Sequence, residues 1–532
     1  MKLVRKYPIG IQSFDSIRRD GYIYVDKTPL IFKMITEGKS YFLSRPRRFG
    51  KSLLCSTLAA IFEGRRDLFE AFTTEYGIEQ PQLFIATTNW RWEEHPVFRF
   101  DFSAGDLRTV DQLDRLIDYS LKRYERQYRI ESFVTDTNIR FQDLLRLSHE
   151  QTGKRAVVIV DEYDSFILHS MGDKEKIDLA RQRFQNLFGP LKEMDDHLQF
   201  VFVTGISKFS QMGIFSKLNQ LNNISMDNAY DSICGISEEE LITQLCPDIE
   251  QLAEKKGMTF DDMVVELKRM YDGYHFSESL TDIYNPFSIV NAFGSGNLKD
   301  YWFSSGTSRA LIDMLAKMPP IDMAQIEGIR MPSTAFDLPL ESFDDPLPLL
   351  YQSGYITIKD YNEDRRMFTL GFPNGEVRTG FADCLYQHVT HSKPSDYSRS
   401  VFLDAYYDFR DSDDLPAFIE AIKTFFASIP YQLDNANEHH YHAILYTLLT
   451  AFGADISAEE SSAKGRANLV LRMPKTIYVI EIKYDGLAQQ ALDQIGEKGY
   501  AEKYRLDGRD IVKVGVNFSS KDRNIESWCS NT

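Results

Sequence analysis

The sequence contains little of what secreted or membrane-spanning proteins need. Its 5 cysteines are scattered through 532 residues with no close pair at zinc-ligand spacing, so neither a disulfide framework nor a zinc site is expected. No uninterrupted apolar stretch approaches the roughly 18 residues that cross a bilayer. The basic N-terminus is not followed by the apolar segment of a secretory signal. We therefore expect reduced thiols in a cytoplasmic protein without a membrane partner.

Positive charge is also scarce. The chain has 61 lysines and arginines against 78 aspartates and glutamates, which gives a formal net charge of −17. Proteins that coat nucleic acid without sequence preference neutralise phosphates with basic residues, so this balance argues against such coating. It does not exclude a local basic cleft, because Arg45, Arg47, Arg48 and Lys51 concentrate positive charge in one short segment.

That basic segment is a candidate phosphate-binding loop. The apolar run Tyr41–Leu43 predicts a buried strand, the sequence RPRRFGKS follows it, and apolar residues at helical spacing predict a helix over Ser52–Phe62. Lys51 would reach the β- and γ-phosphates of a nucleotide, and Ser52 would hold Mg²⁺. Gly-Lys-Ser alone is a weak signal, because a basic turn at a helix start has the same sequence. The remaining candidates for nucleotide contacts are Arg47, Arg48, Phe49 and Gly50.

Two further apolar runs end in polar residues. Ala156–Val160 predicts a buried strand of a parallel sheet, and Asp161 and Glu162 follow it directly. The aspartate suits Mg²⁺ and the glutamate suits a base that orients attacking water, although many strands simply end in acidic residues. Phe200–Thr204 predicts a third strand, where Thr204 either senses the γ-phosphate or caps the strand. We expect the three strands side by side in one parallel sheet, with crossover helices between them.

The region from Tyr7 to about Phe303 resembles the predicted AAA-ATPase-like family of bacteria and archaea. Arg45 stands where phosphate loops usually have glycine, and this arginine belongs to the family's pattern. The resemblance implies a P-loop fold that binds ATP with Mg²⁺. The acidic pair fits hydrolysis better than the phosphoryl transfer of a kinase. The matching segments are Tyr22–Thr28, Arg45–Leu53, Val160–Asp164, Thr204–Lys208, Phe215–Asn219 and Tyr284–Ser288.

The middle of the chain has mainly helical patterns and carries no catalytic motif. Glu238–Leu245 and Phe260–Tyr271 predict two helices of a lid that follows the ATPase sheet. A helix and hairpin over 346–372 is typical of a winged helix, but basic residues are sparse, so a packing module between domains is the stronger alternative. Helical patterns dominate from Val377 to Ala427. Asp26 and Lys27 lie either near the base and ribose or in a capped turn.

The pattern of the last hundred residues predicts a helix, three strands, a helix and a strand, which gives the order αβββαβ. This pattern resembles the core of the PD-(D/E)XK nuclease superfamily, a restriction-endonuclease-like fold. That resemblance implies two carboxylates on neighbouring strands that hold Mg²⁺ or Mn²⁺, beside a lysine that positions water. The predicted elements are Tyr441–Ala451, Ile456–Glu460, Ala467–Leu471, Ile477–Ile482, Leu487–Lys503 and Val512–Phe518.

The nuclease signature departs from the superfamily at one position. Glu481 and Lys483 alternate on one strand and therefore share a face. Asn468 stands where the superfamily has aspartate, and its carbonyl oxygen lacks the charge that Mg²⁺ prefers. Catalytic and metal-binding roles thus fall to Asn468, Glu481 and Lys483, with cleavage in doubt. Glu459 or Glu460 could compensate, or could be solvated strand-end charges. Gln494 either faces this site or is an ordinary polar surface residue.

These observations predict an α/β multidomain protein. We expect an AAA-like P-loop core over 1–235, a helical lid over 236–330, an α-rich linker over 331–435 and a nuclease-like domain over 436–532. The expected function is ATP hydrolysis coupled to a domain that acts on DNA or RNA. The alternative is a nucleotide-dependent switch or scaffold that binds nucleic acid or a protein without cutting. The sequence sets no oligomeric state and is compatible with oligomers.

Overall fold

The chain forms two compact units in the computed structural model. Unit 1 comprises residues 1–302 and 330–374, and unit 2 comprises residues 303–329 and 375–532. The predicted linker over 331–435 therefore contributes to both units. The structure describes residues 5–103, 107–170, 173–207, 221–303, 323–337, 347–390, 397–429, 437–462 and 465–531. The segment Phe215–Asn219 and Lys208, which carry part of the family resemblance, lie outside these ranges.

Unit 1 is built on a parallel sheet with the strand order β4-β5-β6-β1-β7. The strands are β1 (Ser40–Ser44), β4 (Val97–Asp101), β5 (Ala156–Asp161), β6 (Leu198–Gly205) and β7 (Asn222–Asn223). All four neighbouring pairs are parallel. The three predicted apolar runs thus lie side by side as β5, β6 and β1, and helices separate them in sequence as predicted. Their carboxyl ends meet at one edge of the sheet.

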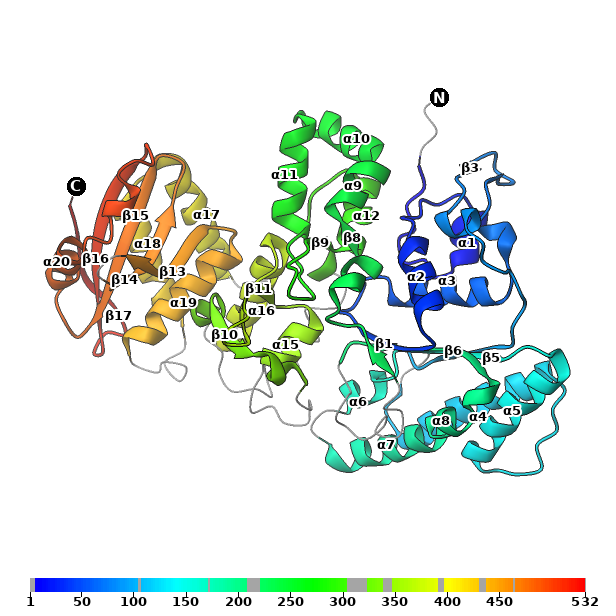
Figure 1. Cartoon of the computed structure of the whole chain (residues 1–532). Helices are drawn as coiled ribbons and strands as arrows, with labels where there is room; N and C mark the ends of the chain where they lie inside the picture. Colours follow the sequence, from blue (N-terminus) through cyan, green and yellow to red (C-terminus); the bar gives the residue numbers. More distant parts are fainter. Residues whose placement is uncertain are drawn as a thin grey trace. The chain divides into compact units, whose positions relative to one another are not determined.

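Helices cover both faces of this sheet (Figure 1). On one face α3 (Lys51–Phe62) packs on β4, β5 and β6. On the other face α4 (Val110–Gln127), α5 (Thr137–Thr152) and α7 (Lys174–Phe188) share an apolar core with the strands. Both faces are therefore dry, which explains why the strands read as continuous apolar runs rather than as alternating patterns.

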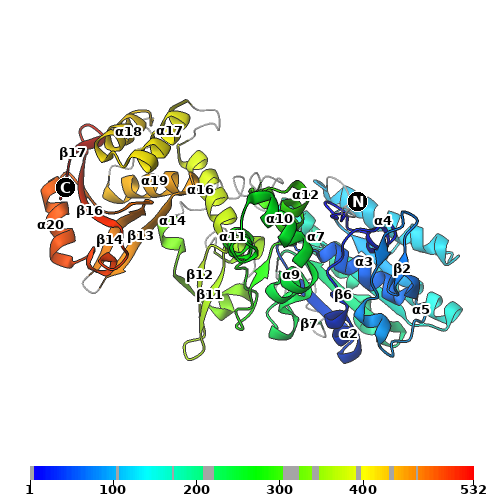
Figure 2. The same cartoon turned by 90° about the horizontal axis from the view of Figure 1, so that it is seen from above.

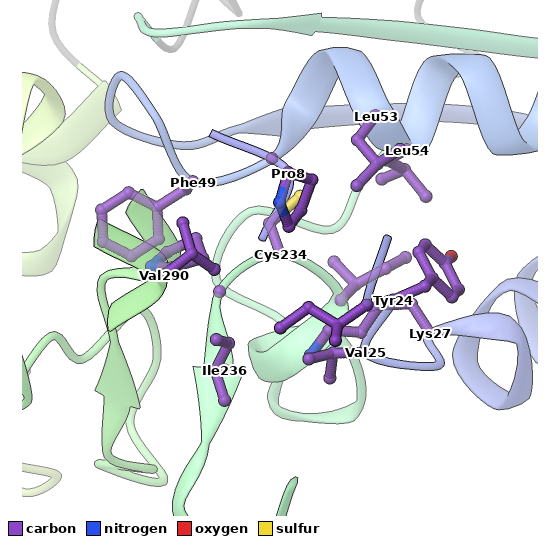
Figure 3. A pocket seen from close by; sticks show the side chains of 15 residues that line it. Pro8, Tyr24, Val25, Lys27, Phe49, Leu53, Leu54, Cys234, Ile236 and Val290 are labelled. Atoms are coloured by element: carbon purple, nitrogen blue, oxygen red, sulfur yellow. The ribbon is translucent and has the colours of Figure 1, made fainter. Parts of the chain in front are cut away.

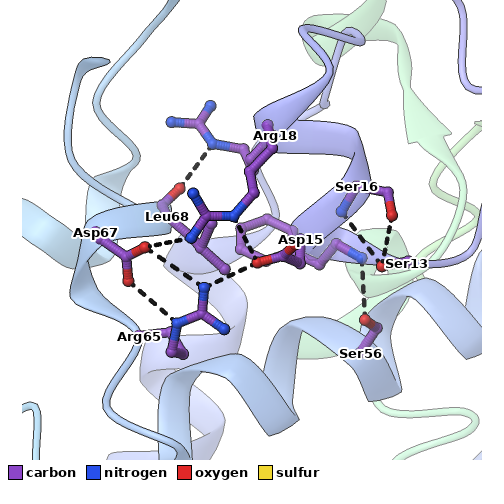
Figure 4. Close-up of polar contacts among 10 residues, drawn as sticks. Ser13, Asp15, Ser16, Arg18, Ser56, Arg65, Asp67 and Leu68 are labelled. Carbon is purple, nitrogen blue, oxygen red and sulfur yellow. Dashed lines mark hydrogen bonds and ion pairs between the residues drawn. The ribbon is translucent and has the colours of Figure 1, made fainter. Parts of the chain in front are cut away.

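The N-terminal helix α1 (Phe14–Arg19) is fastened to the helix that follows the phosphate loop. Its N-cap Ser13 accepts from the Ser16 amide at 3.2 Å, and the Phe14 amide donates to Ser56 Oγ of α3 at 2.9 Å (Figure 4). The buried Arg18 donates from Nε to the Leu68 carbonyl at 2.7 Å. Ion pairs join Arg19 to Asp67 and Arg65 to Asp15, and Figure 4 shows the second of these pairs. The start of the chain thereby braces α3.

A helical lid follows the sheet, as predicted, but it contains one more helix than expected before Asp272. The structure places α9 at Glu238–Gln244, α10 at Cys246–Lys256 and α11 at Phe260–Tyr271, and α12 (Pro286–Ser295) joins them in one core. The missed helix begins at Cys246, and Pro247 follows in its first turn. A proline at the first turn has no amide hydrogen bond to lose, so it starts a helix there rather than ending one.

The middle region forms a short helix and a small sheet. Helix α15 (Leu347–Ser353) leads into the hairpin β11 (Thr357–Asn362) and β12 (Met367–Gly371), as predicted, and β10 (Ile329–Pro332) adds a third strand to it. The hairpin packs on the lid through His275, whose Nδ1 lies 2.6 Å from the carbonyl oxygen of Ile358. This contact favours the packing module over a winged helix.

Unit 2 contains a five-stranded sheet in the order β13-β14-β15-β16-β17. Only β15 and β16 are parallel. Helix α19 (Glu438–Ala451) covers one face and α20 (Ala488–Lys498) the other (Figure 2). The predicted αβββαβ order is present with an additional strand β17. The strands are β13 (Asp455–Ser462), β14 (Gly465–Arg472), β15 (Thr476–Tyr484), β16 (Asp510–Ser519) and β17 (Asn524–Ser530).

The second helix of this domain is shorter than predicted. We expected it to reach Lys503, but α20 ends at Lys498 because Gly499 adopts a left-handed conformation with a φ of 64°. Helices α16 (Gly375–Thr390), α17 (Tyr397–Ser412) and α18 (Leu415–Ala427) fill the region that was predicted to be helical. Among the described helices, none is long and apolar enough for a membrane crossing.

Candidate nucleotide site and nuclease-like site

The candidate phosphate loop joins β1 to the start of α3. Gly50 is the N-cap of this helix with a φ of 95°, and open space surrounds the position where a β-carbon would stand. No side chain caps the helix, so its first amides face that space. Lys51 is buried, and its Nζ donates to the carbonyls of Arg45 and Pro46 at 3.1 Å each. This arrangement offers a helix N-terminus and a lysine to an anion.

Arg45 has a structural role in this loop. Its side chain is 1% exposed, and Nη1 donates to the Ser44 and Ser225 carbonyls at 2.9 and 2.8 Å. Nη2 donates to the Tyr230 carbonyl at 3.2 Å. The guanidinium lies 4.1 Å from the ring centre of Phe276. A glycine could make none of these contacts, so the arginine clamps the loop to the segment that follows β7.

Three further residues of the loop, Arg47, Arg48 and Phe49, contact the lid and its surroundings. Arg48 has a φ of 64° and stacks over the Phe287 ring at 4.3 Å. Phe49 is buried, and its ring packs edge-on against the rings of Tyr274 and Phe276 at 4.8 and 5.4 Å. The Arg47 carbonyl accepts a hydrogen bond from Trp302. The loop is therefore held from outside by aromatic residues distant in sequence.

Asp161 ends β5 beside this loop. It is fully buried, and neither carboxylate oxygen accepts a hydrogen bond of ordinary length from a described residue. Burial raises the pKa of Asp161, and the nearby Ser52 hydroxyl and Lys51 ammonium partly offset that shift. Arg99 on β4 brings its Nη2 to 3.7 Å from Oδ2. A buried carboxylate with two unused oxygens is well suited to a cation.

Glu162 follows in a strained backbone conformation with a φ of 49°. Burial raises the pKa of Glu162, and Lys51 is the strongest influence against that shift. The structure thus brings the acidic pair to the lysine of the loop, as the order of motifs implied. Strain at such a residue is typical of sites where the position of a side chain matters more than local stability.

Thr204 and Ser207 make structural contacts. The Thr204 hydroxyl donates to the Leu43 carbonyl at 2.7 Å, so it ties β6 to β1. The Ser207 hydroxyl and amide both donate to Asp164 Oδ2 at 2.6 Å. We did not assign Asp164 a role from sequence, although it lies in the segment Val160–Asp164. It fixes the end of β6 to the turn after β5, and the predicted sensor role of Thr204 stays a prediction.

An apolar pocket opens next to Gly50 (Figure 3). It encloses about 630 Å³, its mouth included, and is lined by the N-terminal segment, α3, the segment before α9, and α12. Lys27 Nζ at its edge is bound to Glu240 at 2.5 Å and to the Ser232 carbonyl. Asp26 accepts from the amides of Thr28 and Phe84, as in the capped-turn alternative. Lining residues include Pro8, Tyr24, Val25, Leu53, Ile233 and Val290.

The nuclease-like site lies on β14 and β15. Glu481 is buried and accepts hydrogen bonds from Gln494 Nε2 and, at 3.3 Å, from the Asn468 amide. Lys483 Nζ lies 3.6 Å from Glu481 Oε1. Burial raises the pKa of Glu481 to about 7, because the Asn468 amide and Lys483 offset the loss of solvent only partly. The structure brings Asn468, Glu481, Lys483 and Gln494 together.

Asn468 uses its side chain to complete the sheet. Its Oδ1 accepts a hydrogen bond from the Ile482 backbone amide at 2.8 Å, so the side-chain oxygen that would face a metal is engaged by backbone. Glu460 does not compensate, because its oxygens bind Arg472 at 2.6 Å and Lys503 at 2.7 Å. Glu459 is exposed on β13 with a φ of 48°. The described residues include no cluster of three or more metal-ligating side chains.

Helix α19 supplies two residues that the sequence did not reveal. His442 Nε2 lies 2.9 Å from the Asn468 carbonyl oxygen. Glu438, one turn earlier, is close enough to raise the pKa of Glu481, although it is not the main cause. Glu438 and His442 are four residues apart on α19, and this spacing places them on one face of the helix. The sequence gives no sign that this face lies against β15.

Fold and sites together define an α/β protein in which a P-loop domain precedes a nuclease-like domain. Residues 8–215 match the family described as "Predicted AAA-ATPase", and residues 436–528 match the "PD-(D/E)XK nuclease superfamily". The chain is 33% identical over 534 residues to the "Uncharacterized protein in vnfD 5'region" of Azotobacter chroococcum mcd 1, covering 98% of each. The chain therefore belongs to this family of AAA-ATPase-like proteins with a C-terminal nuclease-superfamily domain.

Proposed function

We propose that the protein binds and hydrolyses ATP with Mg²⁺ at the phosphate loop. The observation that carries this proposal is the convergence of Lys51 with Asp161 and Glu162, where Asp161 is buried with two unused oxygens. Ser52 and Asp161 would hold Mg²⁺, which when bound neutralises phosphate charge. Glu162 would orient the attacking water. The helix N-terminus at Gly50 would bind phosphate through backbone amides.

The apolar pocket beside Gly50 gives the nucleotide base a place. Its wall is mostly aliphatic, as in many small-molecule sites. A flat aromatic base would bury apolar surface there while its phosphates reach the loop. Arg47, Arg48 and Phe49 would act mainly by shaping the loop, because the structure commits Arg48 and Phe49 to aromatic contacts.

Filling this pocket tests the proposal. Val290 is half-buried on the pocket wall in α12, so Val290→Phe should occupy space that the base needs. We expect ATP affinity to fall at least tenfold in calorimetry, whereas inorganic triphosphate, which lacks a base, should bind as it does to the unchanged protein.

Val265→Phe is the matched control, because Val265 is 67% exposed on α11 of the same lid. It should leave both affinities unchanged. Absence of ATP binding by the unchanged protein would refute the nucleotide site itself. If Val290→Phe lowers the affinities for ATP and for triphosphate equally, the nucleotide base does not bind in this pocket.

For unit 2 we propose a nuclease-like domain that cleaves nucleic acid weakly or not at all. One of the two expected metal-holding carboxylates is Asn468, and its oxygen already serves the Ile482 amide. As folded, these residues do not fit a Mg²⁺ or Mn²⁺ site with two carboxylates. Basic and acidic residues nearly balance in 436–532, so most of the chain's negative charge lies elsewhere. That balance is compatible with DNA or RNA as a partner.

Restoring the carboxylate should change this site. We expect Asn468→Asp to strengthen Mn²⁺ binding about tenfold or more in calorimetry and to raise any cleavage of DNA or RNA, because a second charge joins Glu481. Glu481→Ala in that background should remove both gains. Asn437→Asp, at the exposed N-cap of α19, is a control that adds the same charge nearby. Efficient cleavage by the unchanged protein would contradict the proposal.

The second candidate function is a nucleotide-dependent switch or scaffold in which unit 2 binds nucleic acid or a protein without cutting. The Asn468 contact favours it, because that contact stabilises the fold at the expense of a metal ligand. The two proposals share the ATP site and differ in whether Asn468→Asp creates cleavage or only metal binding. The four-part division at 235, 330 and 435 is likewise a proposal, and homo-oligomers remain compatible with both.

A further inference from the structure

The chain leaves unit 1 for unit 2 directly after Trp302, and this tryptophan touches the phosphate loop. Trp302 is fully buried, and its indole Nε1 donates to the Arg47 carbonyl at 3.1 Å. Its ring packs against Tyr355 at 5.5 Å. Gly354, with a φ of +86°, lies so close that a β-carbon there would stand 2.7 Å from Pro46 and 3.5 Å from Trp302. Trp302 and Gly354, which are both distant from the loop in sequence, therefore contact the loop at Arg47 and Pro46.

The next residue belongs to the core of unit 2. Phe303 is buried, and a β-carbon on Gly380 of α16 would stand 2.3 Å from its ring. The helices α16 and α19 pack on one another, and Arg378 donates to the Tyr446 hydroxyl between them at 3.1 Å. Helix α19 in turn carries His442 and Glu438 beside the nuclease-like site. Contiguous packing thus extends from Phe303 to Asn468.

We propose that Trp302 positions the phosphate loop, and that the pair Trp302–Phe303 couples nucleotide occupancy to the nuclease-like site. The inference rests on the proposed nucleotide site. Phosphates would draw Lys51 away from the Arg45 and Pro46 carbonyls, and the loop backbone would readjust around them. Because the Arg47 carbonyl accepts a hydrogen bond from the indole, Trp302 would move with the loop backbone. One peptide bond joins Trp302 to Phe303, and both residues are buried, each within its own unit.

Such coupling has a required consequence. If bound nucleotide changes the affinity of the nuclease-like site for its ligand by some factor, then that ligand must change nucleotide affinity by the same factor. The coupling is therefore measured as the change that a ligand at one site causes at the other site. The chain offers clean substitutions, because its 4 tryptophans are Trp90, Trp92, Trp302 and Trp528, and of these Trp302 donates to the loop.

The positioning role is tested with Trp302→Phe, which keeps a buried ring but loses the N–H donor. Without nucleotide, we expect the amides of Gly50, Lys51 and Ser52 to exchange hydrogen faster than in the unchanged protein. With MgATP, we expect affinity to fall about fivefold to tenfold, as for loss of one hydrogen bond. Trp92→Phe is the control, because Trp92 packs on Phe69 at 5.0 Å and should change neither quantity.

Fluorescence gives a readout that a purely structural role would not move. In a protein with Trp90, Trp92 and Trp528 changed to Phe, the emission of Trp302 should shift when MgATP is added. Adding Lys51→Ala should abolish the shift. If loop exchange, affinity and Trp302 emission are all indifferent to these changes while ATP still binds, the positioning role is wrong and the nucleotide site stands.

The coupling is tested by hydrogen exchange in the full chain with a non-hydrolysable ATP analogue. Saturating analogue should change the protection of peptides from α16 and α19 in the unchanged protein, and Trp302→Phe should reduce that change at equal saturation. An analogue that binds without altering these helices would overturn the coupling alone. An analogue that does not bind would overturn the nucleotide site and the coupling with it, while loop exchange without ligand still decides the role of Trp302.

Discussion

Replacing Lys51 with alanine should weaken MgATP binding by roughly 30- to 150-fold, the largest loss we expect from any single change in the ATP site. The ammonium would make charge-assisted hydrogen bonds to phosphate oxygens in a buried setting, which together are worth about 2–3 kcal/mol. Lys51 is 4% exposed, so water could not replace the lost charge efficiently. Calorimetric titration of the full chain with MgATP measures this directly.

The control for Lys51→Ala is Lys122→Ala on α4, where the lysine is exposed and pairs with Asp118. That variant should bind MgATP as the unchanged protein does. In the structure Lys51 also binds two carbonyls of its own loop, so thermal unfolding should be recorded for both variants. Undiminished ATP binding by a folded Lys51→Ala protein would show that the segment from Arg45 to Ser52 is a basic turn and not a phosphate loop.

Glu162→Gln should separate binding from hydrolysis. Glutamine preserves size and hydrogen bonding but cannot accept a proton from water, so we expect MgATP affinity within about twofold of normal and hydrolysis slower by roughly 10²- to 10³-fold. Phosphate release at saturating ATP, together with calorimetry, measures the two quantities. The strained φ of 49° at this residue should tolerate glutamine as it tolerates glutamate, because neither is β-branched.

Glu63→Gln is the matched control for this change. Glu63 lies at the other end of α3, and burial raises its pKa as it does for Glu162. Loss of hydrolysis in both variants would mean that a buried negative charge near α3 matters in general. Loss of hydrolysis in Glu162→Gln but not in Glu63→Gln assigns the catalytic role to the carboxylate at position 162. Normal turnover by Glu162→Gln would move the base elsewhere, and Asp101 at the end of β4 would be the next carboxylate to substitute.

The two sites differ in how their polar groups are used. In the proposed ATP site, neither oxygen of the buried Asp161 accepts a hydrogen bond from a described residue, and the Arg99 guanidinium lies 3.7 Å from one of them. In the nuclease-like site Glu481 and Asn468 are both engaged, by Gln494 and by the Ile482 amide. The first arrangement would gain from a bound cation, whereas the second is satisfied without one. This contrast is the physical basis for proposing a working ATPase beside a weakened nuclease.

Local sequence determined the parts of this protein that depend on neighbouring residues. Continuous apolar runs predicted β1, β5 and β6, because strands buried on both faces have no polar side. The spacing of two residues put Glu481 and Lys483 on one face, and the order of motifs placed Lys51, Asp161 and Glu162 in one site. The sequence analysis did not predict the extra helix α10 or the last strand β17.

Tertiary structure decided everything that depends on contacts between distant segments. It gave Arg45 a clamp on carbonyls near Ser225, brought Arg99 to Asp161, and placed Glu438 and His442 of α19 beside Asn468. It also excluded Glu460 as a substitute ligand by pairing it with Arg472 and Lys503. Sequence periodicity specifies which face of one element a residue occupies. Which other element meets that face is set by long-range packing, so it could be learned only from the fold.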